Sequence, residues 1–175
     1  AKLATKFVGI GSIGKLAAGN IYTGNYLRTE GTNGVLNFGK QFTQRPTRLK
    51  GYFKYTSVEI NKSNDEMKYL IGQPDTCQIF IALGDWSEPV EIRTKPSDRK
   101  LFDKNDPHII AYADMYSGKS VTEYTPFTLE LEYRDTDRIP TYIVVVASAS
   151  KYGDYFTGGD GSVLFLDDFT LEYDY

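Results

Sequence analysis

The sequence predicts an all-β protein, a two-sheet antiparallel β-sandwich of the jelly-roll type. Apolar residues alternate with polar ones along several short runs, all seven prolines fall at or between these runs, and no window of about 12 residues carries a helical apolar stripe. Many short strands without intervening helices stack as two sheets. A chain of 175 residues can bury a core of its own, so we expect one domain over 1–175.

Two runs are predicted to form strands with one face exposed to solvent. The run 125–133 alternates Phe127, Leu129 and Leu131 with polar residues, and the run 48–56 alternates in the same way. Because successive side chains of a strand point to opposite faces, this pattern places one face on a core and the other in water.

Two other runs, 77–83 and 141–149, are continuously apolar and rich in β-branched residues, which is typical of strands covered on both faces. Further strands are expected at 35–38, 108–115 and 162–174. At most a turn or two of helix is expected, at 15–18 and 98–102.

Composition excludes several classes of function. The net charge is -3 and the basic residues are scattered, so nucleic acid is not an expected partner. No apolar stretch reaches the ~18 residues of a membrane span, so we expect no insertion of this domain into a membrane. Cys77 sits in an apolar run and is expected to be a buried, inert thiol. His108, the one histidine, is expected at the surface, which leaves no base for a serine triad.

Gly9, Gly11 and Gly14 spell the G-x-G-x-x-G pattern of a dinucleotide-binding turn. That pattern binds a pyrophosphate only between a strand and a helix N-terminus, and no helix follows here. A phosphate-binding P-loop would also need Ser or Thr where Leu16 stands. We therefore expect a glycine-rich entry to the first strands and no nucleotide site.

The glycine-rich segment 150–169 is the strongest candidate for a ligand site. Tyr152, Tyr155 and Phe156 cluster there with Asp154. A hexose has one apolar face, on which rings can stack, and a rim of hydroxyls, to which carboxylates can bond. These four residues are therefore predicted to bind a sugar.

Trp86 is the second candidate platform for a sugar, in the turn that also carries Asp85. The alternative is that Trp86 and Phe156 cap the ends of the hydrophobic core. The sequence leaves both interpretations open.

Asp167 falls, by strict alternation, on an otherwise apolar face of the last strand. A buried carboxylate must be neutralised or paired, and a structural calcium bound by Asp167 and Asp168 is one solution. The alternative is a bulge at this pair that turns both acids outward.

Three blocks carry a resemblance to a known family: RPTRLKGYFKY (45–55), SASKYGDYFTGG (148–159) and GSVLFLDDFTLEYD (161–174). With shorter blocks along the chain they resemble the putative carbohydrate metabolism domain family, found mostly in gut Bacteroides and their relatives. The resemblance implies a jelly roll similar to galactose-binding and carbohydrate-binding modules. It also implies a C-terminal domain of a longer exported protein, an outer-membrane lipoprotein at the cell surface or a periplasmic protein. It supplies no catalytic residues.

The leading functional hypothesis is a non-catalytic glycan-binding module, with a polysaccharide and the upstream domains of the same chain as its partners. One alternative is a structural or adhesive sandwich without a glycan ligand. The other is a glycoside hydrolase, which needs two carboxyl groups roughly 5 to 9.5 Å apart. No local sequence pattern singles out such a pair.

Overall fold

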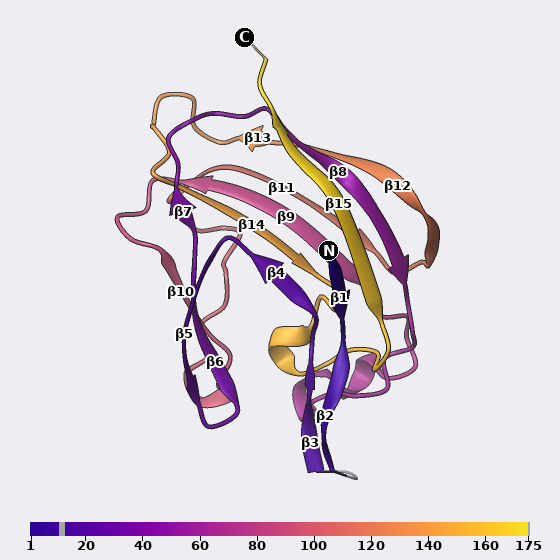
Figure 1. Cartoon of the computed structure of the whole chain (residues 1–175). Coiled ribbons are helices and arrows are strands. Elements are labelled where there is room, and N and C mark those ends of the chain that lie inside the picture. Colours follow the sequence, from indigo (N-terminus) through magenta and orange to yellow (C-terminus); the bar gives the residue numbers. More distant parts are fainter. Residues whose placement is uncertain (11–12, 175) are drawn as a thin grey trace.

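The computed structural model describes residues 1–10 and 13–174. Two antiparallel sheets stack face to face (Figure 1). Sheet 1 has the order β1 (Lys2–Ala4), β15 (Val163–Glu172), β8 (Arg48–Thr56), β12 (Val121–Glu130). Sheet 2 has the order β13 (Glu132–Tyr133), β11 (Ile109–Ser117), β9 (Cys77–Gly84), β14 (Tyr142–Ser148), β4 (Asn20–Tyr22), and β7 (Lys40–Gln41) also pairs with β14. The predicted antiparallel sandwich is confirmed.

Two smaller units extend from the same end of the sandwich, downward in Figure 1. The N-terminal hairpin consists of β2 (Lys6–Ile10) and β3 (Ile13–Ala17). The second unit, here called the β5–β6 arm, has the order β10 (Val90–Arg93), β6 (Asn33–Phe38), β5 (Gly24–Glu30).

Helical structure is confined to three short 3-10 segments in the described part of the chain. They are η1 (Asp65–Leu70), η2 (Pro96–Asp98) and η3 (Gly153–Tyr155). No helix among residues 1–10 and 13–174 is both long enough and apolar enough to cross a membrane.

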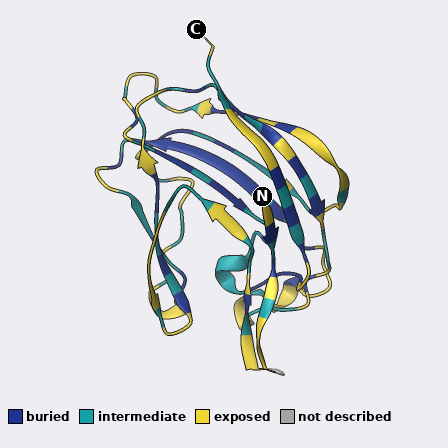
Figure 2. Cartoon of the chain, in the orientation of Figure 1, coloured by how far each residue is buried: buried dark blue, intermediate teal, exposed yellow. Residues whose placement is uncertain are grey.

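The main core lies between the two sheets (Figure 2). Leu49, Phe53 and Tyr55 of β8 are buried there, as the alternation predicts. Phe127 and Leu129 of β12 are buried on the same side. Leu131 and Cys77 also belong to this core, and burial raises the pKa of the Cys77 thiol to about 12. The prediction of a buried, inert cysteine is confirmed.

Sheet 2 is covered on its other face as well. A second cluster packs there, with Phe80 and Ala82 of β9, Val144 and Val146 of β14, and Phe38 of the β5–β6 arm. The continuous apolar runs of β9 and β14 are therefore explained by two cores, one on each side of the sheet.

The last strand corrects one prediction. Leu164 and Leu166 face the core, whereas Asp167 and Asp168 are exposed. The pairing with β8 shifts register between Asp167 and Thr170, and Asp168 adopts a left-handed φ of 50°. The expectation that Asp167 lies on a buried face was wrong, because the core-facing residues are Leu164 and Leu166. Alternation therefore turns Asp167 outward with its exposed partner Tyr52, and the bulge begins only after it.

The exposure of both acids removes the argument for calcium. Exposed carboxylates are solvated by water and need no metal partner. Across the described residues, no group of three or more Asp, Glu, His or Cys side chains is arranged to hold a metal ion.

The glycines near the N-terminus serve the hairpin. Gly9 pairs with Gly14 across β2 and β3, and a Cβ at Gly9 would lie 2.2 Å from the carbonyl oxygen of Ile13. Only glycine permits such a close approach of two backbones. Residues 15–17 therefore continue a strand instead of the helical turn expected at 15–18. Gly11, the third glycine of the pattern, lies outside the described residues.

Candidate functional site

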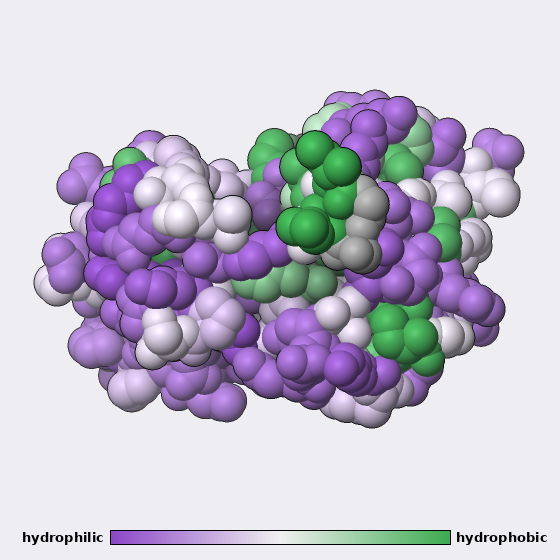
Figure 3. Space-filling model, turned by 90° about the horizontal axis from the view of Figure 1, so that it is seen from below, coloured by the Kyte–Doolittle hydropathy of each residue, from purple (hydrophilic) through white to green (hydrophobic). Residues whose placement is uncertain are grey.

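A cleft lies over the outer face of sheet 2, between the N-terminal hairpin and the β5–β6 arm. Figure 3 looks into this end of the molecule and shows a recess beside the apolar hairpin tip. Two hollows, with cavity volumes of about 200 and about 630 Å³, share the residues Ala18, Asn20, Leu36, Gly153 and Asp154. They form one continuous cleft, which we call the η3 cleft because η3 stands in it.

The floor of the η3 cleft is aromatic and comes from neighbouring strands of sheet 2. Tyr112 and Tyr116 lie four residues apart on β11. On β9, Gln78 pairs with Tyr116, and Phe80 pairs with Asp114. Alternation along each strand turns all four side chains to the same face. Tyr116 is 41% exposed, so part of its ring is open to a ligand.

Both tyrosine hydroxyls of this floor already donate their protons in hydrogen bonds within the protein. Both donate to Oδ2 of Asp114, at 2.9 Å from Tyr112 and 2.5 Å from Tyr116. Burial and then the neighbouring Asp114 raise the pKa of Tyr116 to about 12 and also raise the pKa of Tyr112. Both phenols therefore stay neutral at physiological pH, and their oxygens retain lone pairs that can accept from sugar hydroxyls.

The walls of the cleft are largely apolar. On the side of the β5–β6 arm stand Leu36, Phe38 and Phe102, with the Phe102 and Phe80 ring centroids 5.1 Å apart. On the side of the hairpin stand Leu16 and the strand around it. A few polar groups on apolar walls are the usual composition of a small-molecule pocket.

Phe156 occupies a strained position at the hairpin side of the cleft. It follows η3 with φ 54° and ψ 34°, in the left-handed region that bulky residues rarely adopt. Such strain concentrates at functional sites, where the surrounding structure holds it in place.

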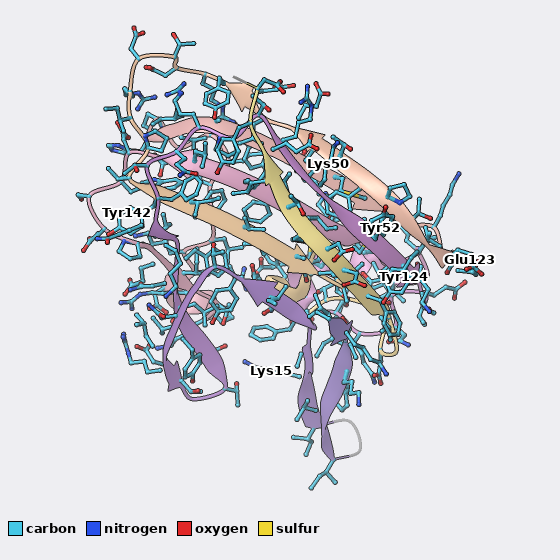
Figure 4. The ribbon with its side chains drawn as sticks, turned by 45° about the horizontal axis from the view of Figure 1, so that its top comes forward. Lys15, Lys50, Tyr52, Glu123, Tyr124 and Tyr142 are labelled. Carbon is cyan, nitrogen blue, oxygen red and sulfur yellow. The ribbon has the colours of Figure 1, made fainter. Side chains whose placement is uncertain are left out.

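Lys15 connects the two walls above this ring. Its Nζ lies 4.2 Å from the centroid of the Phe156 ring and donates to Oδ1 of Asn33 at 3.0 Å. Figure 4 shows the Lys15 side chain extending from β3 toward the β5–β6 arm. The hairpin, η3 and the arm are therefore fixed relative to one another at the mouth of the cleft.

Asp75, which is fully buried, anchors the loop that carries η3. Its Oδ2 accepts from Ser150 Oγ at 2.5 Å and from the Gly159 amide at 2.8 Å. One carboxylate thus holds both ends of the segment 150–159. Burial raises the pKa of Asp75, although these hydrogen bonds oppose the rise.

Asp154 lines both hollows of the cleft and is half-buried. Within residues 1–10 and 13–174 it makes neither a hydrogen bond nor an ion pair. Burial raises the pKa of Asp154, and the charge of Arg99 opposes this rise only in part. An unpartnered carboxylate in a cleft is an acceptor available to a ligand hydroxyl.

Trp86 and Asp85 lie elsewhere, in a separate hollow of about 520 Å³. The Trp86 ring is 7% exposed, contacts Phe102 edge-on, and donates through Nε1 to Asp106 at 3.0 Å. This ring is part of the second core, which leaves little of it open for stacking on a sugar.

Asp85 is already engaged in the Trp86 hollow. Burial raises its pKa, but hydrogen bonds from His108 and Arg138 more than offset this and hold the pKa below its usual value. Its two oxygens bind two different partners. His108 is exposed, as expected.

The two hollows differ in the number of carboxylates that line them. Asp154 is the single carboxylate among the described residues that line the η3 cleft. The Trp86 hollow holds several carboxylates, but the pKa values of Asp85 and Glu91 are lowered. A general acid for glycoside hydrolysis needs a raised pKa, which neither Asp85 nor Glu91 has.

The structure brings three of the four loop residues predicted to bind a sugar to the η3 cleft. Asp154, Tyr155 and Phe156 line the η3 cleft. Tyr152 lies beside Lys151, with the ammonium 5.3 Å from its ring centroid, and does not line either hollow.

Sequence reasoning missed the floor of the cleft. Tyr112 and Tyr116 share a face with Asp114 in the predicted strand, and this alternation of polar aromatics was the signal that could have found them. Phe102 and Lys15 carried no such signal, because only the fold brings them to the cleft.

Comparisons with known proteins identify a family for this chain. The family model described as "Putative carbohydrate metabolism domain" matches residues 1–172. No curated protein matches the sequence.

Two solved structures share the fold. One is described as a putative glycoside hydrolase from Bacteroides thetaiotaomicron, with 24% identity and a TM-score of 0.73 over 99% of this chain and 53% of that chain. The other is described as a putative glycoside hydrolase from Bacteroides vulgatus, with 22% identity and a TM-score of 0.70 over 98% of this chain and 71% of that chain. This chain thus spans about half the length of the first.

Proposed function

Because the chain belongs to the putative carbohydrate metabolism domain family, we propose that it is a non-catalytic glycan-binding module. The observation that carries this proposal is the η3 cleft, in which an aromatic floor with one partly exposed ring, Tyr116, meets apolar walls and one unpartnered carboxylate. Such a surface suits a flat ligand with an apolar face and a hydroxyl rim.

Each part of the cleft has a role in this proposal. The exposed portion of the Tyr116 ring contacts the C–H face of a sugar, and the hydroxyls of Tyr112 and Tyr116 accept from sugar hydroxyls. Asp154 accepts from a further hydroxyl, which replaces the water that its burial excludes. Phe156 and Leu36 supply apolar contact at the two sides.

Binding without hydrolysis is the better account of this cleft. The solved structures named here are described as putative glycoside hydrolases, but each contains sequence beyond the region that this chain matches. One carboxylate cannot serve as both acid and base or nucleophile.

A structural or adhesive role is the second candidate. Val8, Ile10 and Ile13 are 64%, 89% and 82% exposed on the N-terminal hairpin. Exposed apolar groups of this kind favour a protein contact. Ile10 does not line the η3 cleft, so if Ile10→Ser abolishes association with another protein and leaves glycan binding unchanged, the tip serves a separate contact.

The proposal includes a location outside the cytoplasm, at the cell surface or in the periplasm, where the domain and the rest of its chain meet polysaccharide. Cell fractionation followed by protease accessibility of intact cells tests it. Recovery of the full chain only in the cytoplasmic fraction would exclude this location.

A glycan array followed by titration calorimetry tests glycan binding. We compare the wild type with Tyr116→Ala and with Tyr52→Ala, a matched control, because Tyr52 is 43% exposed and lies on β8 in sheet 1 (Figure 4). Loss of one stacked ring weakens binding by about tenfold. We expect that loss in Tyr116→Ala alone. Absence of any ligand, or equal losses in both variants, would refute the proposal.

A further inference from the structure

Positively charged side chains outnumber negatively charged ones around the η3 cleft. Lys15, Lys104 and Lys151 line it. Asp154 is the one acidic residue among its described lining residues, and Asp114 adds a second negative charge beside the floor tyrosines. The protein as a whole has a net charge of -3, so this local excess of cations opposes the overall charge.

These lysines are not neutralised by neighbours. None of the three forms an ion pair with a described residue, whereas Arg48, Arg93 and Arg138 each contact two or more carboxylates. Lys15 donates to an amide oxygen, and Lys151 lies 4.2 Å from the centroid of the Tyr116 ring. A ring and an amide orient an ammonium group but leave its charge uncompensated.

A fourth cation stands behind the cleft. The Arg99 guanidinium lies 4.4 Å from the centroid of Tyr155, a lining residue, and its side chain is 13% exposed. Nη1 pairs with Glu66, but the buried Nε and Nη2 have no hydrogen-bond partner within the described chain. Glu66 compensates part of this charge, so the lysines that line the cleft supply most of its positive potential.

We propose that the glycan bound in the η3 cleft is anionic and carries carboxylate or sulfate groups. This inference rests on the proposed glycan-binding function. The three lysines contact the acidic groups at the rim of the cleft, while the aromatic floor contacts the sugar rings. A field of one sign in a cleft with low-dielectric walls concentrates ligands of the opposite sign, even on a protein of negative net charge.

The test uses ligand pairs with the same sugar backbone, one member charged and the other neutral. Oligogalacturonate is compared with its fully methyl-esterified form, and a sulfated galactan oligosaccharide with its desulfated form, by titration calorimetry at low and moderate salt. We expect the charged member of at least one pair to bind about tenfold more tightly, with an advantage that shrinks as salt screens the lysines. The two pairs distinguish carboxylate from sulfate.

Two double variants that remove the same charge test whether the preference for charged glycans arises in the cleft. The variant Lys104→Gln/Lys151→Gln spares the Lys15–Asn33 bond, and the control Lys2→Gln/Lys119→Gln removes the same charge at exposed positions that do not line the cleft. We expect the first variant to lose most of the charge preference and the control to retain it.

The outcomes separate this inference from the proposal on which it rests. Equal binding of charged and neutral members overturns the inference and leaves glycan binding intact. Equal loss of preference in the variant and the control also overturns it, because bulk charge would then be responsible. Failure of all four ligands, together with an empty array, overturns both.

Discussion

Ser150 Oγ donates to Oδ2 of the fully buried Asp75 at 2.5 Å, and this bond holds the loop of η3 against the sandwich. The Gly159 amide binds the same oxygen. Residues that contact no ligand therefore determine where Asp154 and Phe156 stand in the cleft.

We expect Asp75→Ala to lower the free energy of unfolding by about 1–3 kcal/mol, because it leaves buried donors without an acceptor. The same variant should weaken glycan binding, since the segment 150–159 loses its anchor. Thermal denaturation and calorimetry measure the two effects.

Glu123→Ala is the control for Asp75→Ala, because Glu123 is an exposed acid on sheet 1 without an ion pair among the described residues (Figure 4). Its effect should stay within about 0.5 kcal/mol. Similar stabilities for the two variants would show that Asp75 is not an anchor.

Asp154→Asn should change stability and binding in opposite directions. Burial raises the pKa of Asp154 in the folded protein, so its contribution to stability is fully present below the unfolded pKa and is lost as pH rises through the folded value. At pH 7 the burial of this titratable group costs stability, a cost that asparagine avoids. We expect a higher thermal midpoint than the wild type at pH 7, converging below about pH 4, and weaker glycan binding.

A lower midpoint of Asp154→Asn at pH 7 would contradict this account of Asp154. Asp160→Asn is the matched comparison, since Asp160 is exposed in the same loop. It should show neither the gain in stability nor the loss of binding.

The strands of the sandwich were predictable because burial on one face imposes period-2 alternation, as in β8 and β12. The N-terminal hairpin and β5 were not, because both are mostly exposed and bury no continuous face that would leave a pattern. The sequence offered a bulge at Asp167 and Asp168 as an alternative. It could not decide for the bulge, because the register of the last strand depends on its pairing with β8.

The candidate site was predictable only where its residues are contiguous. Asp154, Tyr155 and Phe156 belong to one glycine-rich loop, and composition alone identified it. Lys15 and Tyr116 reach the cleft from strands that are far apart in the sequence. No local sequence pattern indicates that the fold brings these two residues to the same cleft.

Trp86, the one tryptophan, provides a spectroscopic test between the two hollows. Because its ring is buried against Phe102, glycan binding in the η3 cleft should change its fluorescence little. Trp86→Phe, which keeps an aromatic ring in the core, should retain affinity. A large fluorescence change on binding, or loss of affinity in this variant, would instead support the predicted Trp86 platform.

Asp168→Gly tests the bulge in the last strand. Glycine adopts a φ of 50° without the steric cost that Asp168 bears, so we expect stability to rise by about 0.5–1 kcal/mol. Asp167→Gly, in ordinary strand backbone, should lower it.

Calcium should not shift the thermal midpoint of the wild type relative to chelator, because both acids of the bulge are exposed. A clear rise with calcium would restore the metal hypothesis for Asp167 and Asp168.

The most direct measurement is an NMR titration of the isotope-labelled protein with the glycan that the array selects. The account predicts amide shift changes that cluster at Lys15, Gln78, Tyr116 and residues 153–156, around the η3 cleft. Changes confined to the Trp86 hollow or to the outer face of sheet 1, or none at saturating glycan, would contradict it.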